Sequence, residues 1–121
     1  MIEFIDIGIE NVVAYRLEGK ISTDEMTEIL DLFRSIIEKG DKINIYQEIT
    51  SIGGAELSAL KEKLKFFMDV GLSNFNRIAV VADKKWIPKL IDVEGKIFKN
   101  VDMKGFSMTQ KEEALEFLKN A

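Results

Sequence analysis

Two short runs of β-type residues open the chain. Residues 2–7 (IEFIDI) and 12–18 (VVAYRLE) are rich in β-branched and aromatic side chains, and Gly8 with residues 10–11 separates them. Such a glycine- and asparagine-containing break between two apolar runs is typical of a hairpin or a tight connection. The pattern predicts two strands that pair antiparallel.

A helix is predicted over residues 22–39. Ser22 and Glu25 have the spacing of a capping box, in which each side chain bonds the other residue's backbone amide. Gly40 stands where a residue in the left-handed conformation would end the helix. Between these signals the apolar side chains repeat at helical spacing: Met26, Ile29, Leu30, Phe33, Ile36 and Ile37.

Two later segments have strand patterns of different kinds. Residues 42–49 (KINIYQEI) alternate strictly between two faces, and the face with Tyr46 and Glu48 is predicted to meet water or a partner. Residues 77–82 (RIAVVA) show no polar alternation, which is typical of a strand buried on both faces. We therefore expect an outer strand over 42–49 and a central strand over 78–82.

Helical stripes follow both of these strands. The turn residues of 50–54 precede an apolar stripe that ends near Gly71, and a third helix, 84–99, follows Asp83. A strand near 101–106 and a last helix complete the pattern.

The last helix is predicted over residues 110–119. Thr109 and Glu112 have the spacing of a second capping box at its start. The resulting order, ββαβαβαβα, predicts a small α/β domain whose strands pair in parallel through right-handed crossovers.

The length of the chain indicates the number of domains, and its composition excludes several kinds of active site. With 121 residues, the chain is predicted to form a single domain over residues 1–121. Because it contains no Cys and no His, a disulfide framework, a thiolate nucleophile, a Ser/His/Asp triad and an ordinary zinc site are all excluded. A net charge of -4 disfavours a nucleic-acid partner. The first residues have neither the basic region of a secretion signal nor the apolar length of a membrane span, so we expect a cytoplasmic protein.

Three segments resemble the SpoIIAA-like family, a branch of the STAS (sulfate transporter and anti-sigma factor antagonist) superfamily. They are residues 14–21 (AYRLEGKI), residues 77–87 (RIAVVADKKWI) and residues 113–118 (EALEFL). The resemblance covers nearly the whole chain, and its most specific part is the DKKWI of residues 83–87. It implies an open mixed five-stranded sheet built as a right-handed βα superhelix, with a structural relation to the lipid-binding CRAL-TRIO fold.

Anti-sigma factor antagonists of this superfamily carry an Asp-Ser pair whose serine is phosphorylated by a partner kinase. The matching region here is residues 48–54 (EITSIGG), in which no Asp precedes a Ser. Thr50 and Ser51 are the only nearby hydroxyls, so we expect this surface to bind a partner without a phosphorylation switch.

Asp83 has two interpretations. It follows the central strand, at the end of a parallel sheet where ligands of open α/β folds usually bind. It also precedes a helix that its side chain would cap, and we favour the cap. Glu48 ends the neighbouring strand, so the two carboxylates form a weak candidate for a carboxylate pair or a magnesium site. No phosphate-binding loop accompanies them, and we expect no metal and no cofactor.

The third helix is unusually apolar. Trp86, Ile91 and Phe98 belong to an apolar arc of roughly 160° on the helical wheel, which is wider than one sheet contact needs. Either this helix forms half of a homodimer interface, or it is the lid of a cavity. An enclosed apolar cavity of several hundred Å³ would favour the lid.

These patterns lead to one main interpretation and two alternatives. We expect a non-enzymatic interaction domain, a homodimer that also binds a protein partner. The first alternative is a carrier of a small hydrophobic ligand or lipid, and the second is an enzyme that uses carboxylates and hydroxyls. The candidate surface consists of Glu48, Thr50, Ser51, Asp83, Lys84, Trp86, Ile91 and Phe98.

Overall fold

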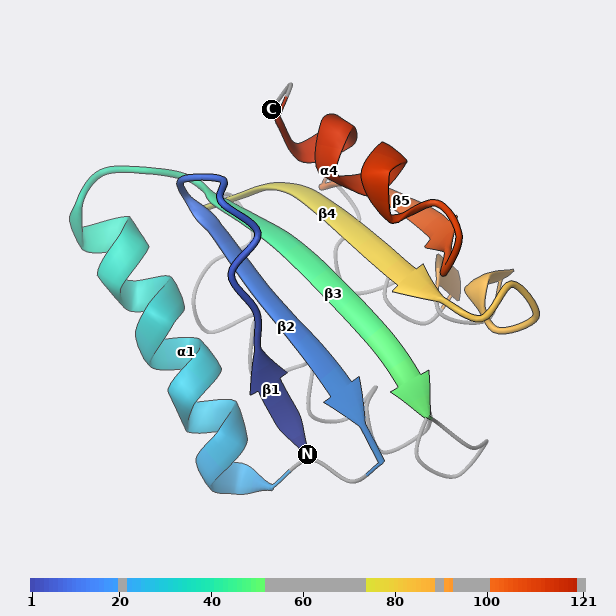
Figure 1. Ribbon diagram of the computed structural model, residues 1–121. Coiled ribbons are helices and arrows are strands. Elements are labelled where there is room, and N and C mark those ends of the chain that lie inside the picture. The colour runs from blue at the N-terminus through green and yellow to red at the C-terminus, as the bar shows by residue number, and fades with distance from the viewer. Residues whose placement is uncertain (20–21, 52–73, 89–90, 93–100, 120–121) are drawn as a thin grey trace.

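The computed structural model describes residues 1–19, 22–51, 74–88, 91–92 and 101–119 (Figure 1). The predicted second helix and most of the third lie outside these residues. The strands and helices are β1 (Ile2–Phe4), β2 (Val12–Glu18), α1 (Thr23–Glu38), β3 (Ile43–Ser51), β4 (Phe75–Ala82), β5 (Asp102–Ser107) and α4 (Lys111–Lys119).

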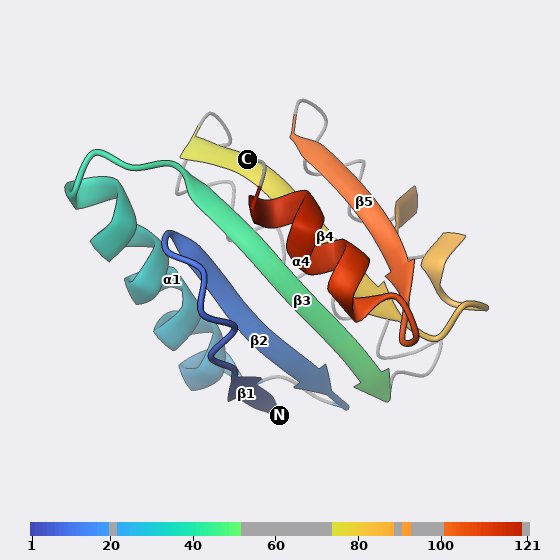
Figure 2. The same ribbon diagram turned by 45° about the horizontal axis from the view of Figure 1, so that its top comes forward.

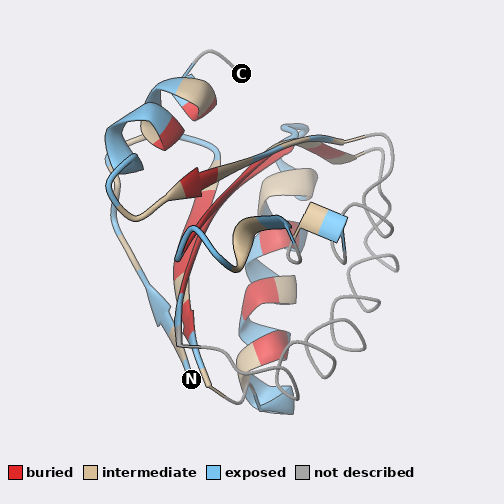
Figure 3. Ribbon diagram, turned by 90° about the vertical axis from the view of Figure 1, so that its right-hand side faces the viewer, coloured by how far each residue is buried: buried red, intermediate tan, exposed pale blue. Residues whose placement is uncertain are grey.

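The five strands form one mixed sheet in the order β1-β2-β3-β4-β5. β1 pairs antiparallel with β2, as its hairpin pattern predicts, and the other three pairings are parallel. α1 and α4 lie on opposite faces of this sheet (Figures 2 and 3). The predicted α/β fold with an open five-stranded sheet is confirmed.

The predicted capping box at the start of α1 is present. Ser22 Oγ accepts a hydrogen bond from the Glu25 amide at 3.1 Å, and Glu25 Oε1 accepts one from the Ser22 amide at 3.0 Å. The second carboxylate oxygen of Glu25 accepts a hydrogen bond from the Ile2 amide, which ties β1 to the helix. Burial raises the pKa of Glu25, but the backbone hydrogen bonds from Ser22 and Ile2 outweigh it, so the net pKa is lowered.

The face of the sheet under α1 holds the larger part of the core. Alternate residues of β2, β3 and β4 meet Met26, Ile29 and Phe33 of α1 there, and the ring of Phe33 meets the edge of Phe75 with centroids 5.3 Å apart. The sheet residues of this cluster are Val13, Tyr15, Leu17, Ile43, Ile45, Ile49, Phe75, Ile78, Val80 and Ala82. The apolar residues 78–82 of β4 lie inside the sheet, as predicted, but β4 is the fourth of the five strands and not the central one.

The expectation that residues 42–49 form an outer strand is wrong. β3 is the middle strand of five, and the predicted wet face, with Asn44, Tyr46 and Glu48, is buried. α4 packs on this face, together with apolar side chains from the segment that connects β1 to β2 (Figure 2). The alternation of this strand therefore separates two buried faces: the α1 face is apolar apart from Gln47, which the Tyr15 hydroxyl bonds, and the α4 face carries Asn44, Tyr46 and Glu48.

α4 begins at Lys111, and its start differs from the predicted Thr109–Glu112 capping box. Gln110 Oε1 accepts a hydrogen bond from the Ser107 amide at 3.0 Å, while the hydroxyls of Ser107 and Thr109 lie 2.9 Å apart. Because the helix begins two residues after Thr109, Gln110 and not Thr109 occupies the position before its first residue. The buried residues of the helix are Ala114 and Leu118.

Arg77 of β4 holds the other end of α4. Its Nη1 donates a hydrogen bond to the carbonyl oxygen of Phe117 at 2.6 Å, and its guanidinium carbon lies 5.0 Å from the centre of the Phe117 ring. A cation at the carboxyl end of a helix bonds free carbonyl groups and offsets the helix dipole.

Replacing Val80 by Asp is expected to unfold the protein. Val80 has no solvent exposure in β4, so the variant would bury an unpaired carboxylate, at a cost of roughly 4 kcal/mol or more. Urea denaturation followed by circular dichroism measures the effect, with Lys42→Asp at an exposed position as the control. A Val80→Asp protein that unfolds at the wild-type urea concentration would contradict this placement of β4.

Candidate functional site

The carboxyl ends of β3 and β4 meet at one edge of the sheet. Ile49 pairs with Ala82, so Thr50 and Asp83 follow at the same level, and Ser51 pairs with Glu18 of β2. Thr50 and Asp83 are both exposed. We call the exposed residues at this level, with the turn that follows Asp83, the carboxyl edge.

Asp83 shapes the turn after β4. Its Oδ1 accepts a hydrogen bond from the Lys85 amide at 3.1 Å, and its carbonyl oxygen accepts one from the Trp86 amide at 2.8 Å. The carboxylate thus has a backbone partner in the turn of residues 84–86, which precedes the first helical residue, Ile87, and the capping of a helix by Asp83 stays a prediction.

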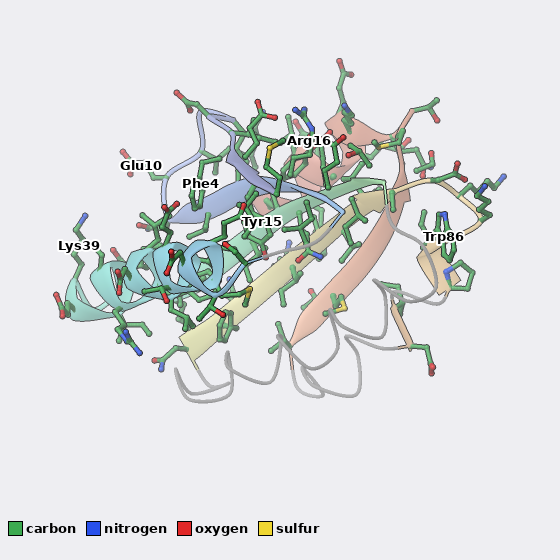
Figure 4. The ribbon with its side chains drawn as sticks, turned by 90° about the horizontal axis from the view of Figure 1, so that it is seen from below. Phe4, Glu10, Tyr15, Arg16, Lys39 and Trp86 are labelled. Carbon is green, nitrogen blue, oxygen red and sulfur yellow. The ribbon has the colours of Figure 1, made fainter. Side chains whose placement is uncertain are left out.

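Of the other predicted residues that follow β4, one is exposed to solvent and two contact the core. Lys84 is exposed, whereas Trp86 and Ile91 are half-buried and pack against the core on the α1 face. Figure 4 shows Trp86 at the end of the molecule opposite Lys39. Phe98 lies outside the described residues. The described part of the apolar arc therefore contacts the sheet, and a dimer through helix 84–99 stays a prediction.

Glu48 does not contribute to an exposed surface. Only 2% of the residue is exposed, because it lies on the face that α4 covers. Arg16 Nη2 of β2 lies 3.0 Å from Glu48 Oε2, and Lys111 Nζ of α4 lies 2.7 Å from Oε1. Glu3 of β1 adds a second carboxylate 3.0 Å from Arg16 Nη1. We call Arg16, Glu48, Lys111 and Tyr46 the Glu48 cluster.

The buried charge of Glu48 is compensated within this cluster. One buried carboxylate stands between two cations, and each cation keeps part of its surface in water. Burial is the largest cause that raises the pKa of Tyr46, to about 12, and the charge and hydrogen bond of Glu48 act in the same direction. The Coulomb attraction of Glu48 raises the pKa of the Arg16 guanidinium. The raised pKa values keep Tyr46 neutral and Arg16 charged around neutral pH, which suits a structural role better than proton transfer.

A hollow of about 740 Å³ opens beside the carboxyl edge. It lies between the turn after β4 and the turn that joins β5 to α4. The side chains around it are Asp83, Lys84, Ile87, Pro88, Ser107, Met108, Thr109 and Gln110. Ser107, Met108, Thr109 and Gln110 were not predicted as site residues. The sequence nevertheless indicated their position, because a predicted strand that ends near residue 106 and runs parallel to β4 must end at the same edge of the sheet.

The contact between Ile87 and β5 bears on the carrier interpretation. A Cβ atom added to Gly105 would collide with Ile87 Cγ2 and lie 3.4 Å from Ile91 Cγ1. These side chains thus rest directly on the β5 backbone, and at this point there is no room for an apolar ligand between them and the sheet. Within the described residues, no group of three acidic side chains is placed to hold a metal ion.

Comparison with known proteins gave one match. The sequence model of a protein family described as SpoIIAA-like matches residues 12–119, from the start of β2 to the end of α4. No curated protein and no solved structure matched the chain.

Replacing Glu48 by Gln is expected to lower the pKa of Tyr46 from about 12 towards the ordinary tyrosine value of about 10. The substitution removes the negative charge, while burial keeps part of the shift. Ultraviolet absorbance across a pH titration measures the phenolate, and Tyr46→Phe assigns the signal against Tyr15, the other tyrosine.

The stability of the wild type gives an independent readout of the same interaction. The pKa of Tyr46 is higher in the folded than in the unfolded chain, so its contribution is complete below about pH 10 and is lost as the pH rises towards 12. Equal tyrosine titration curves for the wild type and Glu48→Gln would show that Glu48 does not act on Tyr46.

Proposed function

The chain belongs to the SpoIIAA-like family, and on this premise we propose that it is a non-enzymatic STAS-type interaction domain that binds a partner protein at its carboxyl edge. The observation that carries the proposal is the hollow beside that edge, which the ends of β4 and β5 form together. In open α/β sheets, the carboxyl ends of parallel strands are the usual binding position.

The chemistry of the hollow suits a protein surface. Ile87, Pro88 and Met108 provide apolar contact, while Thr109 and Gln110 offer hydrogen-bonding groups. This mixture of an apolar centre with polar groups around it is typical of protein interfaces. Lys84 adds a positive charge at the rim, which favours an acidic group on the partner.

The ionisable groups near this edge support binding over catalysis. Glu48 is engaged with Arg16 and Lys111, and Asp83 accepts a backbone hydrogen bond within its own turn. A general base needs a free basic atom within reach of a substrate proton. Glu48 offers no such atom, because Arg16 and Lys111 bind its two oxygens, and Asp83 already uses one of its oxygens to close the turn.

We place this binding in the cytoplasm and expect no phosphorylation switch. No helix among the described residues is long and apolar enough to cross a membrane. The Thr50 hydroxyl donates a long hydrogen bond of 3.5 Å to the Leu17 carbonyl oxygen, and no Asp precedes a Ser in residues 48–54. The partner is therefore expected to bind the unmodified chain.

Two charge reversals test the position of the binding surface. Lys84→Glu changes the rim of the hollow, and Lys42→Glu makes the same change at an exposed position before β3, at the opposite edge of the sheet. Tagged versions are expressed in the cells that encode the protein, and quantitative mass spectrometry identifies the proteins recovered with each. Affinity for the purified partner is then measured by titration calorimetry.

Lys84→Glu is expected to weaken binding by roughly tenfold or more, because it places a like charge against the partner's acidic group. Lys42→Glu should leave the affinity within about threefold of the wild type. Equal affinities for the two variants would place the binding surface elsewhere. Stoichiometric phosphate on Thr50 or Ser51 in the recovered chain would instead support a phosphorylation switch.

A further inference from the structure

A second groove lies far from the carboxyl edge, between α1 and the edge of the sheet. It has a volume of about 720 Å³ and is bounded on one side by Phe4, Ile5 and residues 12–14. The other side is a stripe of α1, in which Ile36 also packs against the core: Glu28, Asp31, Leu32, Ser35, Ile36 and Lys39. We call this the α1 groove.

The α1 groove gathers apolar surface that the core does not use. Phe4 and Leu32 are each 41% exposed, and with Met1 they are the large apolar side chains that stand out in the described chain. Figure 4 shows Phe4 beside α1, with Lys39 at the carboxyl end of the helix. Two of these three side chains thus line one groove, which is typical of an interaction surface.

The groove exists because β1 is short. Its three residues pair with residues 15–17 of β2 only, and after Phe4 the chain turns towards the α4 face of the sheet. Beyond this pairing, the Ile5 amide bonds the Ala14 carbonyl oxygen at 2.9 Å. Val12 and Val13 therefore have no partner residue in β1, and both line the groove.

The α1 stripe carries opposite charges at its two ends. Glu28 stands at one end and Lys39 at the other, about 16 Å apart along the helix axis, with Asp31, Leu32, Ser35 and Ile36 between them. If two such helices pack antiparallel about a two-fold axis, Glu28 of each faces Lys39 of the other. In the described residues, neither Glu28 nor Lys39 has an ion pair within its own chain, whereas Asp31 lies 3.5 Å from Arg34.

We propose that the α1 groove is a homodimer interface in which α1 packs antiparallel against α1 of a second copy. A two-fold interface must be complementary to itself. The stripe meets this condition, since its opposite charges exchange ends, Leu32 and Ile36 lie near the two-fold axis, and Asp31 keeps Arg34 of its own chain as a partner. Leu32 and Phe4 would then be covered by the second copy. This interface is independent of the carboxyl edge.

A charge exchange across the proposed two-fold axis tests the arrangement. Sedimentation equilibrium of the wild type at micromolar concentration should show a dimer. Glu28→Lys alone and Lys39→Glu alone should each weaken dimerisation by roughly tenfold, since symmetry converts two attractive contacts into repulsive ones. The double variant Glu28→Lys/Lys39→Glu should recover the wild-type dissociation constant to within about threefold.

Two further variants distinguish the loss of the interface from unfolding and from a general effect of net charge. Leu32→Asp should abolish dimerisation without changing the circular dichroism spectrum, because Leu32 lies outside the core. Glu38→Lys makes the same charge change as Glu28→Lys at an exposed α1 position outside the groove, and it should leave the dimer intact.

A wild-type monomer at the highest concentration measured would overturn the proposal. A dimer unaffected by Leu32→Asp would also overturn it, and would place the interface elsewhere, for example on helix 84–99. If both single charge reversals weaken the dimer but the double variant does not recover, the antiparallel arrangement is wrong.

Discussion

Much of this structure depends on the burial of one carboxylate. Glu48 lies in the middle strand of the sheet with only 2% of its surface exposed, and a buried charge is stable only when it is paired. The two cations that meet it come from different elements, Arg16 from β2 and Lys111 from α4. The requirement to neutralise Glu48 therefore fixes the start of α4 over the sheet.

The Glu48 cluster also reaches the edge of the sheet, and a separate contact holds the far end of α4. Arg16 also binds Glu3, which links the short strand β1 to the Glu48 cluster. At the other end of the helix, Arg77 bonds the Phe117 carbonyl oxygen. With both ends of α4 fixed by charged groups, the turn from β5 into the helix keeps a defined position. That turn is one wall of the hollow at the carboxyl edge.

Local patterns were sufficient to predict most of the fold. The Ser22–Glu25 capping box and the uniform apolarity of residues 78–82 each depend on near neighbours, and the structure agrees with both. The burial of Glu48 could not be predicted in this way. Alternation shows that a strand has two different faces, but the cover of the polar face comes from α4, more than sixty residues later.

The candidate site shows the same limit. The parallel-strand rule correctly brought Thr50 and Asp83 to one edge, and the DKKWI segment correctly indicated the family. To assign Ser107 and Gln110 to this edge, the rule would have required the exact end of β5. Sequence patterns place strand ends only to within a few residues. The arc of helix 84–99 was wide enough for two contacts, and a helical wheel does not show that Ile87 and Ile91 rest on Gly105.

A double-mutant cycle between Glu48 and Lys111 tests most directly whether the buried carboxylate holds α4 on the sheet. The free energy of unfolding is measured for Glu48→Gln, Lys111→Met and the double variant, with the exposed pair Glu116 and Lys119 as the control cycle. The Glu48–Lys111 pair should give a coupling of about 1 kcal/mol or more, and the control pair less than about 0.5 kcal/mol. Equal and negligible couplings in the two cycles would contradict this role of Glu48.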